Sequence, residues 1–179
     1  MNTPTKIISD TSALEAICKA QYHPDVFTNL PFSTTNICVE EVKRNRSMAS
    51  GTREEALGQV LDYIRSGDAT VFPTDIEHDP YVDHQGEDSI VWTLENADTT
   101  NVRYIFLFDG PASDELKNIV ADGGIEVSTP GRPYELVWQG GFITEDEHHE
   151  ALREIATEEG WEGEQLIDPL VHTEYEDVF

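Results

Sequence analysis

Four acidic residues in this sequence have the types and positions to carry chemistry. Asp10 follows a short strand-like segment at residues 6–9, and Asp109 follows the strongly apolar segment 102–108. Glu41 and Glu87 lie in segments with helical character. Open α/β proteins keep their sites at the carboxyl edge of the sheet. We therefore expect these four carboxylates to converge at one such edge.

Carboxylates gathered in this way would form an oxygen-rich cage, which suits Mg²⁺ or Mn²⁺. Without a cation they would repel one another, and at least one should have a raised pKa. One or two such ions can polarise a phosphodiester and stabilise the leaving oxygen. The pattern predicts a metal-dependent nuclease in which Asp10, Glu41, Glu87 and Asp109 are both the catalytic and the metal-binding residues.

Each candidate has a structural alternative. Asp10 could cap the following helix, although Thr11 and Ser12 could do so instead and leave Asp10 free. Acidic side chains at helix starts are also favoured by the exposed backbone N–H groups. Glu40 stays open as an alternative to Glu41, and Asp88 as an alternative to Glu87.

Few other side chains suggest chemistry. Lys43, Arg44 and Arg46 form the densest basic patch, which would suit either a phosphate-contacting rim or surface salt bridges. The pair His148-His149 is expected at the surface rather than at a metal. No phosphate-binding glycine loop and no nucleophile-elbow motif is present, so nucleotide cofactors and serine hydrolase chemistry are not supported.

The charge balance is extreme, with 36 acidic residues against 11 Lys and Arg and a formal charge of −25. Molar salt shortens the Debye length to about 3 Å and would screen the repulsion. Because the acids are spread along the chain, we interpret them as adaptation to the salty cytoplasm of a halophilic archaeon, not as nucleic-acid mimicry. In such salt a negative surface does not exclude a nuclease, since long-range attraction to phosphates is screened anyway.

The remaining composition predicts a cytoplasmic protein. Cys18 and Cys38 are the only cysteines and belong to no Cys-x-x-Cys motif, so we expect both to be reduced and near the core. No segment approaches the roughly 20 apolar residues of a membrane helix, so no membrane contact is expected. The N-terminal segment has no signal-peptide pattern.

Strand and helix patterns alternate along the first 129 residues. This predicts a three-layer α/β/α sandwich with a mostly parallel central sheet. Segment 102–108 is expected to be the central strand, buried on both faces. Residues 130–179 are expected to form a C-terminal helical extension and tail packed on the same domain. The expected strands are 6–9, 32–34, 69–72, 102–108 and 125–128. The expected helices are 12–20, 52–65, 86–97, 113–121, 134–139 and 144–158. One more helix is expected to be capped by Thr35 or Asn36 and to end before a polar connection at 45–51.

Several of these segments resemble the PIN-domain family. Residues 8–14, Ile-Ser-Asp-Thr-Ser-Ala-Leu, are similar to its opening motif, and Val39-Glu40-Glu41-Val42 resembles its second acidic motif. Residues 86–90 resemble its Gly-Glu-Ala-Ser-Ala segment, and Asp109 takes the place of the acid after its buried strand. In that last motif Phe108 replaces a common small hydroxyl residue.

The resemblance implies a Mg²⁺- or Mn²⁺-dependent ribonuclease, with Asp10, Glu41, Glu87 and Asp109 in its acidic positions. It also implies RNA as substrate, and it suggests the toxin of a toxin–antitoxin pair, an antitoxin protein as partner, and a homodimer. The alternative is a catalytically inactive PIN-like module that binds RNA or a protein. A phosphatase of the aspartyl-phosphate type is disfavoured, because Ser12 stands where such enzymes use a second aspartate.

Overall fold

The computed structural model describes residues 6–108 and 110–160. A five-stranded, all-parallel sheet of order β3-β2-β1-β4-β5 forms its centre, which confirms the predicted α/β/α sandwich. The elements in chain order are β1 (Lys6–Ser9), α1 (Thr11–Ile17), α2 (His23–Asn29), β2 (Phe32–Thr35), α3 (Asn36–Met48), α4 (Thr52–Ser66), β3 (Ala69–Phe72), α5 (Gln85–Asn96), β4 (Val102–Phe106), α6 (Gly110–Val120), β5 (Glu126–Ser128), α7 (Arg132–Gln139) and α8 (Glu145–Glu159).

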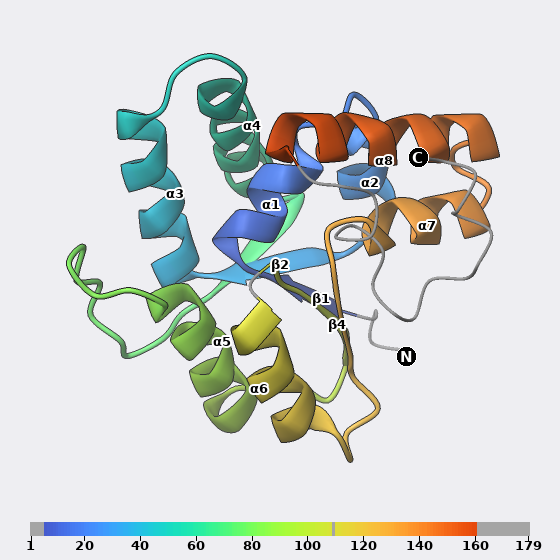
Figure 1. Cartoon of the computed structure of the whole chain (residues 1–179). Helices are drawn as coiled ribbons and strands as arrows, with labels where there is room; N and C mark the ends of the chain where they lie inside the picture. Colours follow the sequence, from blue (N-terminus) through green and yellow to red (C-terminus); the bar gives the residue numbers. More distant parts are fainter. Residues whose placement is uncertain (1–5, 109, 161–179) are drawn as a thin grey trace.

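Helices cover both faces of the sheet, and successive side chains of β1 point alternately into the two helical layers. Ile7 faces a core shared with α1, α2, α4, α7 and α8, whereas Ile8 faces a smaller core shared with α5 and α6. Figure 1 shows the same division, with α1, α4 and α8 above the sheet and α5 and α6 below it. Strand β1 is buried on both faces, as parallel strands between helical layers usually are.

Three sequence predictions are corrected. The first helix spans Thr11–Ile17 rather than 12–20, and α3 continues to Met48 through part of the expected polar connection. The strand at 102–106 pairs with both β1 and β5, so it is an interior strand, but the centre of the sheet is β1. Its Arg103 is exposed, so this strand is not buried along its whole length.

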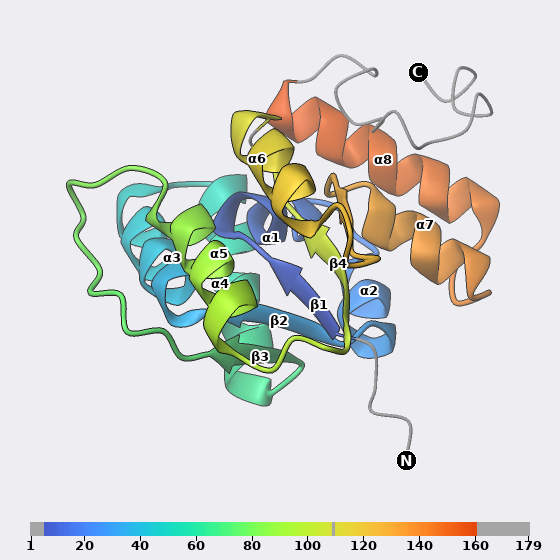
Figure 2. The ribbon, with the colours of Figure 1, turned by 90° about the horizontal axis from the view of Figure 1, so that it is seen from below.

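The C-terminal helices pack on the first helical layer. The Tyr134 hydroxyl donates to the Ile17 carbonyl at 2.7 Å, and Val137 and Ile155 belong to the same core as Leu14. Helix α8 starts with the predicted capping box of Thr144 and Glu147. Figure 2 shows α7 and α8 side by side. The expected tail at 161–179 lies outside the described residues.

The parallel sheet brings the segments after three strands to one edge. Asp10 follows β1, α3 follows β2, and Leu107 and Phe108 follow β4. The register Ile8↔Ser33 and Ser9↔Phe106 aligns these strand ends. Cys18 and Cys38 are buried free cysteines, as predicted. None of the described helices is long and apolar enough to cross a membrane.

Candidate metal centre

Asp10 is the innermost acid at the carboxyl edge of the sheet and is only 2% exposed. Its backbone N–H donates to the Phe106 carbonyl at 3.1 Å, which ties it to the end of β4. Its Oδ1 accepts from the Ala13 N–H at 2.7 Å and caps α1. Of the two alternatives left open by the sequence, capping by Asp10 is the one observed, and Thr11 and Ser12 do not cap this helix. Asp10 is the last residue before the helix and has an extended backbone, so its side chain can reach the N–H of Ala13.

The electrostatic surroundings of Asp10 are unusual. Burial raises the pKa of its carboxyl from 3.8 to about 8, the Ala13 N–H opposes that rise, and the charges of Glu87 and Glu41 add to it. The backbone N–H of Phe108 also donates to the Asp10 side chain and lowers its pKa slightly. Because this pKa lies above that of the unfolded chain, the folded protein holds the Asp10 proton more tightly than the unfolded chain does. The stability that this protonation provides is lost as the pH rises from 3.8 toward about 8. Asp10, Glu41 and Glu87 thus share one electrostatic environment, and we call them the carboxylate cluster.

Glu41 is held from two sides. The Thr11 hydroxyl donates to its Oε2 at 2.6 Å, and the Gly86 N–H donates to its Oε1 at 3.0 Å. A Cβ atom at Gly86 would lie 2.7 Å from Oε2, so glycine is needed for this close approach. Glu40, in contrast, is exposed and pairs with Lys43 at 2.7 Å. The structure thus places Glu41, not Glu40, beside Asp10.

Glu87 comes from the first turn of α5, next to Gly86. It is half-buried and close enough to Asp10 to raise the pKa of that carboxyl, whereas Asp88 is exposed. Of the four predicted acids, the structure brings together Asp10, Glu41 and Glu87. Asp109 lies outside the described residues.

The other polar candidates contribute little to this edge. Arg46 extends toward Gly58 of α4. A Cβ atom added at Gly58 would lie 3.3 Å from the Arg46 Nη2. Lys43 is engaged by Glu40. His148 is buried and stacks on Trp138 with ring centroids 4.9 Å apart, so the prediction of a surface position was wrong for it.

The arrangement as described is not a closed metal cage. Within residues 6–108 and 110–160, no three His, Cys, Asp or Glu side chains lie close enough to enclose an ion. Mg²⁺, however, keeps several waters and is commonly bound through one or two carboxylates together with substrate phosphates. The buried Asp10 and its two acidic neighbours are therefore a donor set of the right chemistry.

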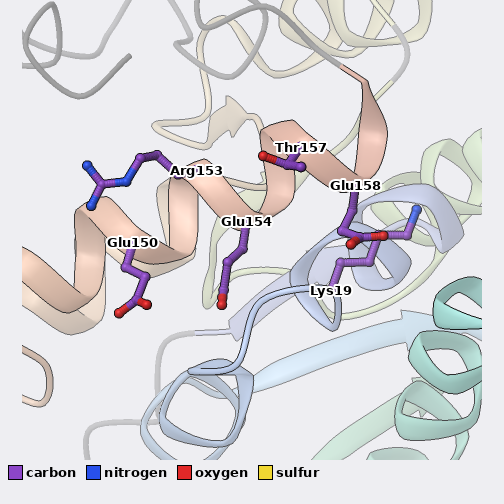
Figure 3. Close-up of a pocket in the computed structure, with 6 residues that line it drawn as sticks. All are labelled: Lys19, Glu150, Arg153, Glu154, Thr157 and Glu158. Carbon is purple, nitrogen blue, oxygen red and sulfur yellow. The ribbon is translucent and has the colours of Figure 1, made fainter.

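Sequence reasoning missed the two residues that hold Glu41. Thr11 and Gly86 each stand directly beside a predicted acid, and that adjacency was the available signal. A pocket of about 270 Å³ lies near the far end of α1, away from the cluster (Figure 3). Its lining residues are Lys19, Glu150, Arg153, Glu154, Thr157 and Glu158.

Comparison with known proteins agrees with the fold. None of the functionally curated proteins matches this chain in sequence. The sequence profile described as the halobacterial PIN domain matches residues 2–173, which is nearly the whole chain. Proteins with PIN domains are typically metal-dependent nucleases. With its parallel sandwich, its acids at the carboxyl edge and this match, the chain belongs to the halobacterial PIN domain family.

Proposed function

We propose that this protein is an endoribonuclease that uses Mg²⁺ or Mn²⁺ to hydrolyse RNA phosphodiester bonds. The observation that carries the proposal is the burial of Asp10 at the sheet edge, with Glu41 and Glu87 from two other elements acting on its charge. Such an accumulation of negative charge is unfavourable alone and favourable around a cation. Asp109 is proposed as a fourth ligand on the basis of the sequence.

The residues of the chain prepare this site before any substrate binds. Backbone N–H groups of Ala13 and Phe108 fix the Asp10 carboxyl, and Thr11 with Gly86 fixes that of Glu41. Their rotamers are thus set by hydrogen bonds rather than by the ion, which reduces the reorganisation needed for binding. A bound divalent cation would supply Lewis-acid polarisation of the phosphodiester and neutralise developing charge.

We further propose RNA as the substrate and an antitoxin protein as a partner that covers the acidic edge, with the protein acting as the toxin of such a pair. A homodimer is the proposed assembly. A second candidate function is a non-catalytic module that binds RNA or a protein. The observation that favours it is the lack of three enclosing metal donors among the described residues.

The test compares wild type with Asp10→Asn in molar KCl. Asparagine keeps an oxygen that can accept from Ala13 N–H, so the cap and the fold should be retained. We expect Mn²⁺ binding by calorimetry and RNA cleavage in wild type, and the loss of both in the variant. The matched control is Asp88→Asn, which removes an exposed acid from the first turn of α5 and should change neither.

The outcomes separate the two functions. Cleavage that persists in Asp10→Asn would exclude this site as the catalytic centre. RNA binding without Mn²⁺ binding or cleavage in wild type would favour the non-catalytic module. Growth arrest on expression, relieved by Asp10→Asn, would support the toxin assignment.

A further inference from the structure

Phe108 places an aromatic ring beside the carboxylate cluster. Its backbone N–H donates to the Asp10 side chain, and the Asp10 N–H in turn donates to the Phe106 carbonyl at 3.1 Å. Phe106 and Leu107 are buried, at 0% and 2% exposure. Phe108 is 36% exposed. The chain therefore turns outward at this residue and presents the ring at the edge where Asp10 lies.

The Phe108 ring is only partly exposed, and it carries no atom that can bind a metal or a phosphate. Its face is suited to another planar group, and the bases of unpaired RNA provide one. Because the backbone of residue 108 is hydrogen-bonded to Asp10, the ring lies close to nucleotides whose phosphate a cation would hold at that carboxylate. Phe108 thus lies next to the proposed site of phosphodiester cleavage and offers an aromatic face on which a base can stack.

The negative charge of the protein makes an uncharged contact such as base stacking important for RNA binding. At a formal charge of −25, the molecule as a whole repels RNA, and in molar salt contacts between cations and phosphates weaken further. Stacking of a base on an aromatic ring involves no net charge and depends on the substrate having an unpaired base. Affinity for RNA at this edge must therefore come largely from contacts that salt does not screen.

We propose that Phe108 stacks on an unpaired base next to the scissile phosphate and thereby restricts the site to single-stranded or looped RNA. This inference rests on the proposed ribonuclease function and names the form of RNA that the site accepts. Duplex RNA keeps its bases inside the helix and cannot offer one to the ring.

The experiment uses the full chain in 2 M KCl with Phe108→Ala, Phe108→Tyr and Phe142→Ala. Phe142 is the matched control, because it is also exposed, at 54%, but lies in the turn between α7 and α8. Fluorescence anisotropy with a labelled single-stranded oligoribonucleotide in EDTA measures binding without cleavage. Cleavage of the same RNA with Mn²⁺ gives KM and kcat, and calorimetry gives Mn²⁺ affinity.

We expect Phe108→Ala to weaken RNA binding and to raise KM by about 5- to 150-fold, the range of one lost base stack. Mn²⁺ affinity should stay at the wild-type value, Phe108→Tyr should restore RNA binding, and Phe142→Ala should match wild type. Wild type should also prefer the single strand to a duplex of the same sequence.

Other outcomes overturn the inference in distinguishable ways. Unchanged RNA binding in Phe108→Ala, or equal cleavage of duplex and single strand, refutes the stacking role while leaving the nuclease intact. RNA binding that depends on Phe108 without any cleavage would support the base contact and refute the catalytic proposal. A wild-type protein that neither binds RNA nor cleaves it with Mn²⁺ would refute both, and the ring would then be a candidate contact for a protein partner.

Discussion

Glu41 is the acid of the carboxylate cluster that two other helices anchor. Its two oxygens accept from a side chain of α1 and from the backbone of α5, so three elements meet at this carboxylate. Partners that orient a metal ligand commonly change metal affinity by about 10- to 100-fold when removed. The Thr11 hydroxyl is therefore expected to matter for metal binding although it is not one of the predicted ligands.

Replacing Thr11 with valine should weaken Mn²⁺ binding by about 10-fold, because the Glu41 carboxylate loses the donor at Oε2. Thr11→Ser keeps the hydroxyl and should bind as wild type does. Gly86→Ala should also weaken binding, since its Cβ would displace Glu41. Calorimetry measures the affinities and a thermal melt tests the fold. Wild-type affinity in folded Thr11→Val would show that Glu41 does not need this hydrogen bond.

At the scale of elements, the alternation of strands and helices was predictable, whereas the contacts within the site were not. Local patterns such as the capping residues Thr35 and Thr144 are visible in sequence because their partners lie three residues away. Thr11 and Glu41 are 30 residues apart, and Glu41 and Gly86 are 45 apart. Such contacts depend on how the strands line up, so the position of Thr11 and Gly86 beside predicted acids marks them as neighbours of the site but does not show that they bind Glu41.

The extension of α3 to Met48 has a similar cause. Its last turns are polar, and polar residues alone predict a connection. Packing against α4 stabilises them as a helix, with Arg46 lying along Gly58. Tertiary contacts of this kind routinely override local propensity. The same argument applies to His148, whose burial between α7 and the core could not be read from a polar helix face.

The packing of α8 on α7 should depend on pH through His148. Burial lowers the pKa of this imidazole to about 4, with a smaller effect from His149. In the unfolded chain the pKa is about 6.5, so below that pH the unfolded state takes up a proton that the folded state does not. Stability should therefore fall between about pH 6.5 and 4, by about 1.4 kcal/mol per pH unit.

Thermal melts at pH 7.5 and 5.0 test this for wild type and His148→Phe. Phenylalanine can keep the stack on Trp138 but cannot take up a proton, so the variant should lose less stability on acidification. His78→Phe, a change in the loop before α5, serves as the control and should lose as much as wild type. Equal acid sensitivity of wild type and His148→Phe would contradict the assignment to His148.

At the scale of the whole molecule, the formal charge of −25 makes stability depend on salt. The Debye length falls from about 8 Å at 0.15 M to about 3 Å at 1 M, which removes most repulsion between surface acids. We therefore expect the melting temperature to rise steadily as KCl increases from 0.2 to 3 M. A melting temperature that does not change with KCl would contradict the interpretation of the acids as adaptation to molar salt.

Two single substitutions distinguish electrostatic effects on stability from other effects of salt. Glu95 is exposed in the last turn of α5, where negative charge opposes the helix dipole, and Glu145 is exposed in the first turn of α8, where it is favoured. Glu95→Gln and Glu145→Gln each change the formal charge from −25 to −24. At 0.2 M KCl, Glu95→Gln should raise the melting temperature by about 1 to 4 °C, and Glu145→Gln should raise it less or lower it. Both differences should disappear at 3 M KCl, because they are electrostatic and screened. Differences that persist at 3 M would mean that these glutamates act through packing or hydration instead.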